Sequence, residues 1–122
     1  MPRSVKSIFT SAGDGIYRAF LQEKNMKVHG IAAIAALLLA GILQIGMVKT
    51  AIILLCIAFV FAVELMNTAL EVFIDFIVEE EYYWAAAKAK DMAAGAVLCA
   101  AIFALFIGLL FFLPPIWILL TR

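Results

Sequence analysis

Charged side chains are scarce in this chain of 122 residues, of which 15% are charged and 67% are hydrophobic. A typical soluble domain has about a quarter of its residues charged and about half apolar. Nine lysines and arginines balance nine aspartates and glutamates, so the chain lacks the basic excess of a nucleic-acid-binding protein. With a mean hydropathy of +1.13, the sequence predicts a membrane protein that has no nucleic-acid partner.

Cysteine is scarce as well. Cys56 and Cys99 each lie inside an apolar run, with no second cysteine or histidine nearby. This isolation excludes a zinc knuckle and argues against a disulfide framework. We interpret both cysteines as small hydrophobic side chains.

Linker-like segments are missing, because the glycines are scattered and no low-complexity tract occurs. We therefore expect one domain over residues 1–122. Three apolar stretches are long enough to cross a bilayer, which takes about 20 residues. The sequence predicts membrane-spanning helices over about 28–48, 50–79 and 88–113. The third is expected to end near Pro114 and Pro115, since proline cannot continue the hydrogen-bond ladder of a helix.

The first 27 residues contain polar and charged side chains throughout and lack the uninterrupted apolar region of a signal peptide. We expect this segment to be retained. Its apolar positions follow the spacing of one helix face, which predicts an amphipathic helix on the membrane surface over about 4–24. A frayed amphiphilic tail is the alternative, because Gly13 and Gly15 weaken helix propensity.

Lysine and arginine are unevenly distributed around the expected spans. Seven lie before the first span or between the second and third, whereas Lys49 and Arg122 fall on the other side. By the positive-inside rule, this distribution predicts a cytoplasmic N-terminus.

Acidic side chains interrupt the second expected span. Glu64, Asn67, Glu71 and Asp75 occur at i, i+3, i+7 and i+11, which places them on one helix face. At about 1.5 Å per residue from Lys49, Glu64 lies about 22 Å along the helix, within a hydrocarbon layer of about 30 Å. Glu64 is therefore expected inside the membrane and is a functional candidate, with a register-fixing ion pair as the structural alternative. Lipid headgroups can solvate the other two acids, Glu71 and Asp75.

Further ionisable groups are expected at the same cytoplasmic level. Lys90 and Asp91 precede the third span, and Glu23, Lys27 and His29 precede the first. Carboxylates with a lysine and an amide favour an Mg²⁺ site that also holds the phosphates of a nucleotide. The chain has no Walker A sequence, so side chains and metal would have to hold the nucleotide. A small ion-conducting oligomer and a purely structural membrane protein remain alternatives.

Three segments carry a resemblance to a known family. They are GIYRAFLQEKNMKVH at residues 15–29, ELMNTALEVFID at residues 64–75 and AKDMAAGAV at residues 89–97. In these segments the chain resembles the prokaryotic diacylglycerol kinase and undecaprenol kinase family. The resemblance implies an all-α integral membrane protein of the bacterial inner membrane. It also implies a homotrimer with active sites shared between subunits.

The resemblance further implies transfer of the γ-phosphate of ATP to a membrane lipid alcohol, with Mg²⁺ as cofactor. It assigns Glu64 as the catalytic base and Asn67 as a residue that positions the reacting groups. Glu23 and Glu71 would hold the metal at the phosphates, and the nucleotide site would add three residues: Asp75, Lys90 and Asp91. Residues 25–29 and the segment around Gly95 favour undecaprenol as acceptor, with diacylglycerol as the alternative.

Overall fold

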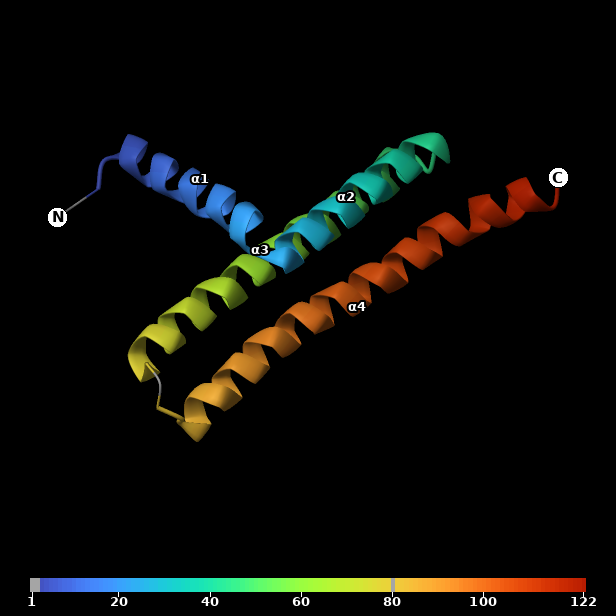
Figure 1. Ribbon diagram of the computed structural model, residues 1–122. Helices are drawn as coiled ribbons and strands as arrows, with labels where there is room; N and C mark the ends of the chain where they lie inside the picture. The colour runs from blue at the N-terminus through green and yellow to red at the C-terminus, as the bar shows by residue number, and fades with distance from the viewer. Residues whose placement is uncertain (1–2, 80) are drawn as a thin grey trace.

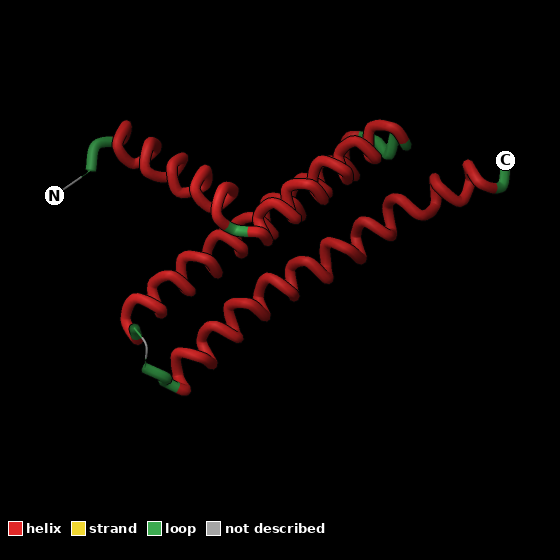
Figure 2. Tube along the Cα trace, viewed as in Figure 1, coloured by secondary structure: helices red, strands yellow, loops and turns green. Residues whose placement is uncertain are grey.

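A computed structural model describes residues 3–79 and 81–122. Within these ranges the secondary structure consists of helices and contains no strand. The helices are α1 (Val5–Gln22), α2 (Lys24–Ile42), α3 (Met47–Val78) and α4 (Trp84–Leu120). Figure 1 shows the three long helices running along one another while α1 leaves at an angle near the start of α2. Short segments connect them (Figure 2).

Helices α2, α3 and α4 are each long and apolar enough to cross a membrane. The predicted class, an all-α multi-pass membrane protein with three spans and an N-terminal amphipathic helix, is confirmed. The central helix is α3, which packs on both α2 and α4, whereas α2 and α4 contact each other little. Residues on α3 are therefore the ones that reach both neighbours.

Helix α1 is continuous through Gly13 and Gly15, so the alternative of a frayed tail does not apply. Its first turn is capped by Ser4, whose side chain accepts a hydrogen bond of 3.1 Å from the Ser7 backbone N–H. At its other end the Phe20 ring packs on Phe61 of α3, with 5.6 Å between ring centroids. The contact between Phe20 and Phe61 holds the end of α1, and with it the start of α2, beside α3.

The first spanning helix ends at Ile42, several residues before the predicted end near residue 48. The Gln44 N–H donates to the Gly41 carbonyl, and the Ile45 N–H donates to the Ala40 carbonyl. This pair of bonds is a Schellman motif, which terminates a helix. Gln44 takes the left-handed position of the motif, with φ of 52°, which glycine usually occupies. The sequence pattern misses this end because the residue at the turn is not glycine.

The third spanning helix passes through Pro114 and Pro115 and ends at Leu120, so the predicted end near residue 113 is wrong. Proline keeps a helical φ but has no N–H, and each proline therefore leaves the carbonyl four residues earlier without a donor. The carbonyls concerned belong to Leu110 and Phe111. Membrane helices tolerate such a loss where other groups or water can satisfy the carbonyls.

A contact between α3 and α4 lies at the same height as the carbonyls of Leu110 and Phe111. The ammonium of Lys49, in the first turn of α3, lies 5.7 Å from the centroid of the Phe111 ring. This distance suits a cation–π interaction. The start of α3 and the last third of α4 therefore share one end of the molecule, and the α3–α4 turn forms the other.

Candidate functional site

Two buried polar side chains lie on α3 among otherwise apolar buried residues. Glu64 is 2% exposed and Asn67, almost one turn later, is 8% exposed. Within the described ranges, Glu64 Oε2 and Asn67 Oδ1 are buried without a hydrogen-bond partner. A buried polar atom without a partner costs about 1–3 kcal/mol. Such groups in a native structure call for an explanation, and a catalytic role is one.

A cavity of about 270 Å³, here called the polar cavity, holds both side chains. Helix α2 contributes Asn25 and His29 to its lining, and α4 contributes small and apolar side chains. His29 Nε2 lies 3.4 Å from Glu64 Oε2, close to but outside hydrogen-bond geometry. The polar cavity therefore presents one carboxylate, two amides and one imidazole.

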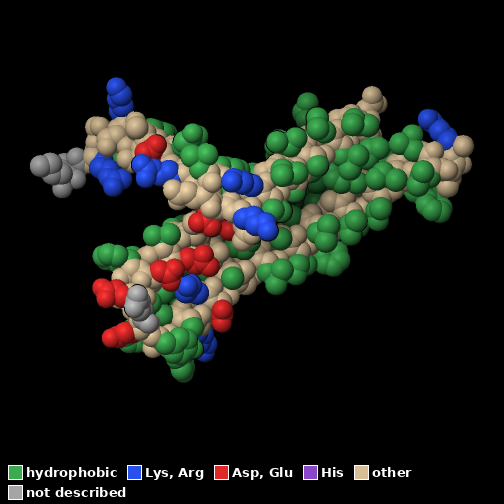
Figure 3. Space-filling view, viewed as in Figure 1, with side chains coloured by type: hydrophobic (Ala, Val, Ile, Leu, Met, Phe, Trp, Pro, Cys, Tyr) green, Lys and Arg blue, Asp and Glu red, His purple; other side chains and the backbone are tan. Residues whose placement is uncertain are grey.

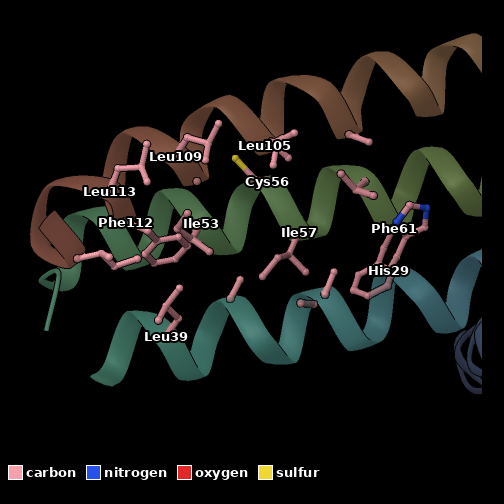
Figure 4. Close-up of a pocket in the computed structure, with 18 residues that line it drawn as sticks. His29, Leu39, Ile53, Cys56, Ile57, Phe61, Leu105, Leu109, Phe112 and Leu113 are labelled. Carbon is pink, nitrogen blue, oxygen red and sulfur yellow. The ribbon is translucent and has the colours of Figure 1, made fainter. Parts of the chain in front are cut away.

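A second cavity of about 450 Å³ adjoins the first and is here called the apolar cavity. His29 and Ala101 line both cavities. Figure 4 shows the ring of His29 beside Phe61 at one end of the apolar cavity, with Leu39 and Leu113 toward the other end. A molecule with a hydrocarbon tail and a polar head could thus contact the apolar cavity and Glu64 together.

A third cavity, of about 310 Å³, lies at the α3–α4 turn and is here called the lysine cavity. Its lining includes Asp75 of α3 and Lys90 and Asp91 of α4. Lys90 Nζ donates a hydrogen bond of 2.8 Å to Asp75 Oδ1. Glu71 and Asp91 are also close enough for their charges to act on Lys90. One cation therefore lies among three carboxylates.

Two tyrosines, Tyr82 and Tyr83, complete the lysine cavity on the side of the turn. The Tyr83 hydroxyl donates a hydrogen bond of 2.6 Å to Glu81 Oε2. This bond raises the pKa of Tyr83, because it favours the protonated hydroxyl beside a carboxylate. The acidic residues Glu79 and Glu81 of this turn are exposed, and Glu80 lies outside the described residues.

The predicted site residues divide between the two polar regions. Glu64 and Asn67 share the polar cavity, whereas Asp75, Lys90 and Asp91 share the lysine cavity. The remaining two, Glu23 at the α1–α2 junction and Glu71 on α3, are half-buried and line neither cavity. On the face shown in Figure 3, acidic side chains gather toward the α3–α4 turn. Hydrophobic side chains cover the opposite end.

Sequence reasoning did not assign Asn25 or His29 to the site, although both line the polar cavity. The two residues are four positions apart, which places them on one face of α2. This spacing could have identified them as a pair. It could not have shown that their face meets Glu64.

Glu23 and Glu71, the residues expected to hold Mg²⁺, can be compared with the ligands that this ion takes in proteins. Among residues 3–79 and 81–122, no three histidine, cysteine, aspartate or glutamate side chains are grouped to hold a metal ion. Mg²⁺ commonly takes only one or two protein carboxylates and completes its shell with phosphate oxygens and water. The half-buried carboxylates of Glu23 and Glu71 have the right donor chemistry for such a partial shell.

Comparison with known proteins gives one matching family model. The prokaryotic diacylglycerol kinase model matches residues 10–112, which include every residue of both polar regions.

Named relatives match over similar lengths. The undecaprenol kinase of Bacillus subtilis is 40% identical over 108 residues, covering 88% of this chain and 87% of the relative. The diacylglycerol kinase of a Synechocystis species is 38% identical over 108 residues, and the match spans 62% of that longer protein. The diacylglycerol kinase of Escherichia coli is 31% identical over 90 residues, with 74% of this chain and 73% of the relative covered.

Proposed function

The chain belongs to the prokaryotic diacylglycerol kinase family of membrane lipid kinases, and we propose that it transfers the γ-phosphate of ATP to the hydroxyl group of a membrane lipid alcohol. The observation that carries this proposal is the buried Glu64 carboxylate, which faces a polar cavity adjoining an apolar one. This placement suits a base that receives a proton from an acceptor arriving through the hydrocarbon. Proton removal by a positioned carboxylate commonly accelerates a reaction about 100- to 10,000-fold.

In the proposed reaction, Glu64 accepts the proton of the lipid hydroxyl while the hydroxyl oxygen attacks the γ-phosphorus. The bond between the γ-phosphorus and the β,γ-bridging oxygen breaks, and ADP leaves with that oxygen. Asn67 holds the reacting groups in position through its side-chain amide, whose oxygen is unpartnered in the polar cavity. Phosphoryl transfer depends mainly on positioning and on charge stabilisation. A few buried polar groups on rigid helices can supply both.

The nucleotide is proposed to bind toward the α3–α4 turn, where the lysine cavity opens. Lys90 would exchange its Asp75 partner for phosphate oxygens, and Asp91 and Asp75 would complete the nucleotide site. Glu23 and Glu71 are proposed to hold Mg²⁺ beside the phosphates. When bound, Mg²⁺ would neutralise the negative charge of the triphosphate. Glu23 and Glu71 would thereby hold Mg²⁺ at the cytoplasmic side of the site.

We propose a homotrimer in the bacterial inner membrane, with a cytoplasmic N-terminus and active sites shared between subunits. The distribution of lysine and arginine supports this orientation. In this proposed orientation the lysine cavity would lie at the cytoplasmic surface, where ATP is available. Exposed apolar side chains along α2 and α4 are consistent with contacts to lipid or to further subunits.

Undecaprenol is the proposed acceptor. Its support is the resemblance of residues 25–29 and the segment around Gly95 to the undecaprenol branch of the family. Diacylglycerol is the second candidate acceptor, because a relative named diacylglycerol kinase is 38% identical to this chain.

The experiment is a kinase assay with γ-labelled ATP, Mg²⁺ and the purified chain in lipid nanodiscs. Undecaprenol, diacylglycerol and ceramide are added separately, and the products are separated by thin-layer chromatography. We expect labelled undecaprenyl phosphate to form fastest, while faster labelling of phosphatidic acid would assign diacylglycerol instead. Without lipid phosphorylation on any acceptor, the proposed function would be wrong. The Glu64→Gln variant, prepared identically, controls for contaminating kinases.

A further inference from the structure

His29 of α2 and Glu64 of α3 face each other across the polar cavity. The separation between His29 Nε2 and Glu64 Oε2 is 3.4 Å, and the two side chains are 20% and 2% exposed. Oε2 is buried and has no hydrogen-bond partner in this arrangement. A small rotation of the imidazole would bring a ring N–H within hydrogen-bond range of this oxygen. Such a hydrogen bond would supply the partner that the buried carboxylate lacks.

We propose that His29 is a positioning residue for the transfer step: its Nε2–H binds Oε2 of Glu64 and leaves Oε1 of the same carboxylate to meet the acceptor hydroxyl. This inference rests on the proposed lipid kinase function. It gives the two carboxylate oxygens different tasks. One oxygen is held by the protein, and the other takes the proton.

The location of the ring fits this task. His29 lines both the polar and the apolar cavity, so the body of the ring can contact hydrocarbon while a ring nitrogen faces Glu64. An imidazole combines these properties because it has an apolar body and a polar edge. The same residue therefore borders the path of the lipid tail and orients the group that meets the lipid head.

Apart from His29 and Glu64, no ionisable side chain of the described residues lines the polar cavity. The lining of the polar cavity otherwise consists of neutral amides and apolar side chains: Asn25 and Val28 from α2, Asn67 from α3, and Ala94, Val97, Leu98 and Ala101 from α4. On the other side of the His29 ring, the apolar cavity adds the thiol of Cys56. Helix α1 contributes the Phe20 ring, which packs on Phe61 and Gly30.

Two variants separate the hydrogen bond from the volume of the ring. In His29→Phe the ring remains but the N–H is lost, and we expect kcat to fall about 10- to 100-fold, as expected for a misplaced catalytic group. The KM for MgATP should change little. In His29→Gln an N–H donor remains, so kcat should stay closer to that of the wild type, a rescue that a purely structural role for the ring would not give. Cys99→Ala, on an exposed position of α4, is the control and should change neither quantity.

A second measurement does not depend on activity. The chain contains one histidine, so selective labelling gives one imidazole to follow by NMR in nanodiscs. Glu64→Gln should shift the ring nitrogen resonances at neutral pH, because the facing carboxylate is replaced by an amide. Asp75→Asn, an equally conservative change on the same helix but in the lysine cavity, should leave them unchanged.

The outcomes distinguish this inference from the proposed function. A wild-type chain that phosphorylates no lipid would overturn the function. Wild-type kcat in His29→Phe would overturn only the role of His29, as would His29 resonances that are insensitive to Glu64→Gln. If His29→Phe fails to assemble, His29→Gln and the NMR comparison still decide.

Discussion

Lys90 Nζ donates a hydrogen bond of 2.8 Å to Asp75 Oδ1 and joins the first turns of α4 to the last turns of α3. The two side chains are 35% and 61% exposed. An ion pair this accessible contributes little to stability, because water and salt screen it. Its accessibility also means that phosphate oxygens can replace Asp75 as the partner of Lys90.

The first prediction concerns this lysine. Lys90→Met should raise the KM for MgATP about 10-fold or more, since a charge-assisted hydrogen bond is worth about 1.5–3 kcal/mol. The melting temperature should change little. Lys88→Met is the matched control, because Lys88 Nζ lies 5.1 Å from the centroid of the Trp84 ring and outside the lysine cavity. Equal KM values for the two variants would remove Lys90 from the nucleotide site.

The second prediction concerns the proposed base. Glu64→Gln should lower kcat at least about 100-fold, because an amide cannot accept the hydroxyl proton. The unfolding temperature should be retained or raised, since a buried amide avoids the cost of a buried charge. Turnover and thermal unfolding are measured on the same preparation. Asp14→Asn, at an exposed acid paired with Arg18 at 3.9 Å on α1, serves as control, and substantial turnover by Glu64→Gln would exclude the assigned role.

The third prediction concerns Mg²⁺. Removing the metal with a chelator should abolish turnover. Glu23→Gln and Glu71→Gln should each raise the Mg²⁺ concentration for half-maximal activity, because each replaces a charged ligand by a neutral one. The measurement is a Mg²⁺ titration of initial rate at saturating ATP and lipid. Titration curves that coincide with those of wild type and Asp14→Asn would show that these two carboxylates do not hold the metal.

The fourth prediction tests the turn between α2 and α3. Gln44→Gly should stabilise the protein by about 1 kcal/mol, because Gln44 has a φ of 52° that costs a residue with a Cβ about 1–2 kcal/mol. Gly46→Ala should destabilise it, since Gly46 has a φ of 98°. Open space surrounds Gly46, so its effect would come from backbone conformation and not from a clash. Denaturant-induced unfolding in detergent measures both, and equal stabilities would contradict the turn geometry.

The spans and the buried acid could be predicted from the sequence because the membrane imposes strong constraints. Long apolar runs indicate spanning helices, and Glu64 interrupts such a run at a depth where charge is costly. The ends of the helices depend on finer properties. The Schellman turn at Gln44 uses a residue that rarely takes a positive φ, and the continuation past Pro114 depends on what can satisfy a freed carbonyl.

The grouping of the polar residues depends on helix rotation, which the sequence pattern fixes only in part. Apolar side chains surround most of α2, so its sequence does not reveal which face meets α3. For this reason the pairing of His29 with Glu64 could not be predicted. The stripe from Glu64 to Asp75 was predicted as one surface, but α3 is long enough for its two ends to reach different cavities.

The paired prolines of α4 have a consequence for how the protein responds to its lipid environment. Hydrocarbon cannot satisfy the carbonyls of Leu110 and Phe111, and the Lys49 ammonium lies at the height of the Phe111 ring. Lipid headgroups should therefore meet the protein at this height in bilayers of any thickness. In a thicker bilayer, the additional hydrocarbon would therefore lie at the opposite surface, nearer the acidic residues of the α3–α4 turn. The turnover rate should then depend on the acyl-chain length of the surrounding lipids.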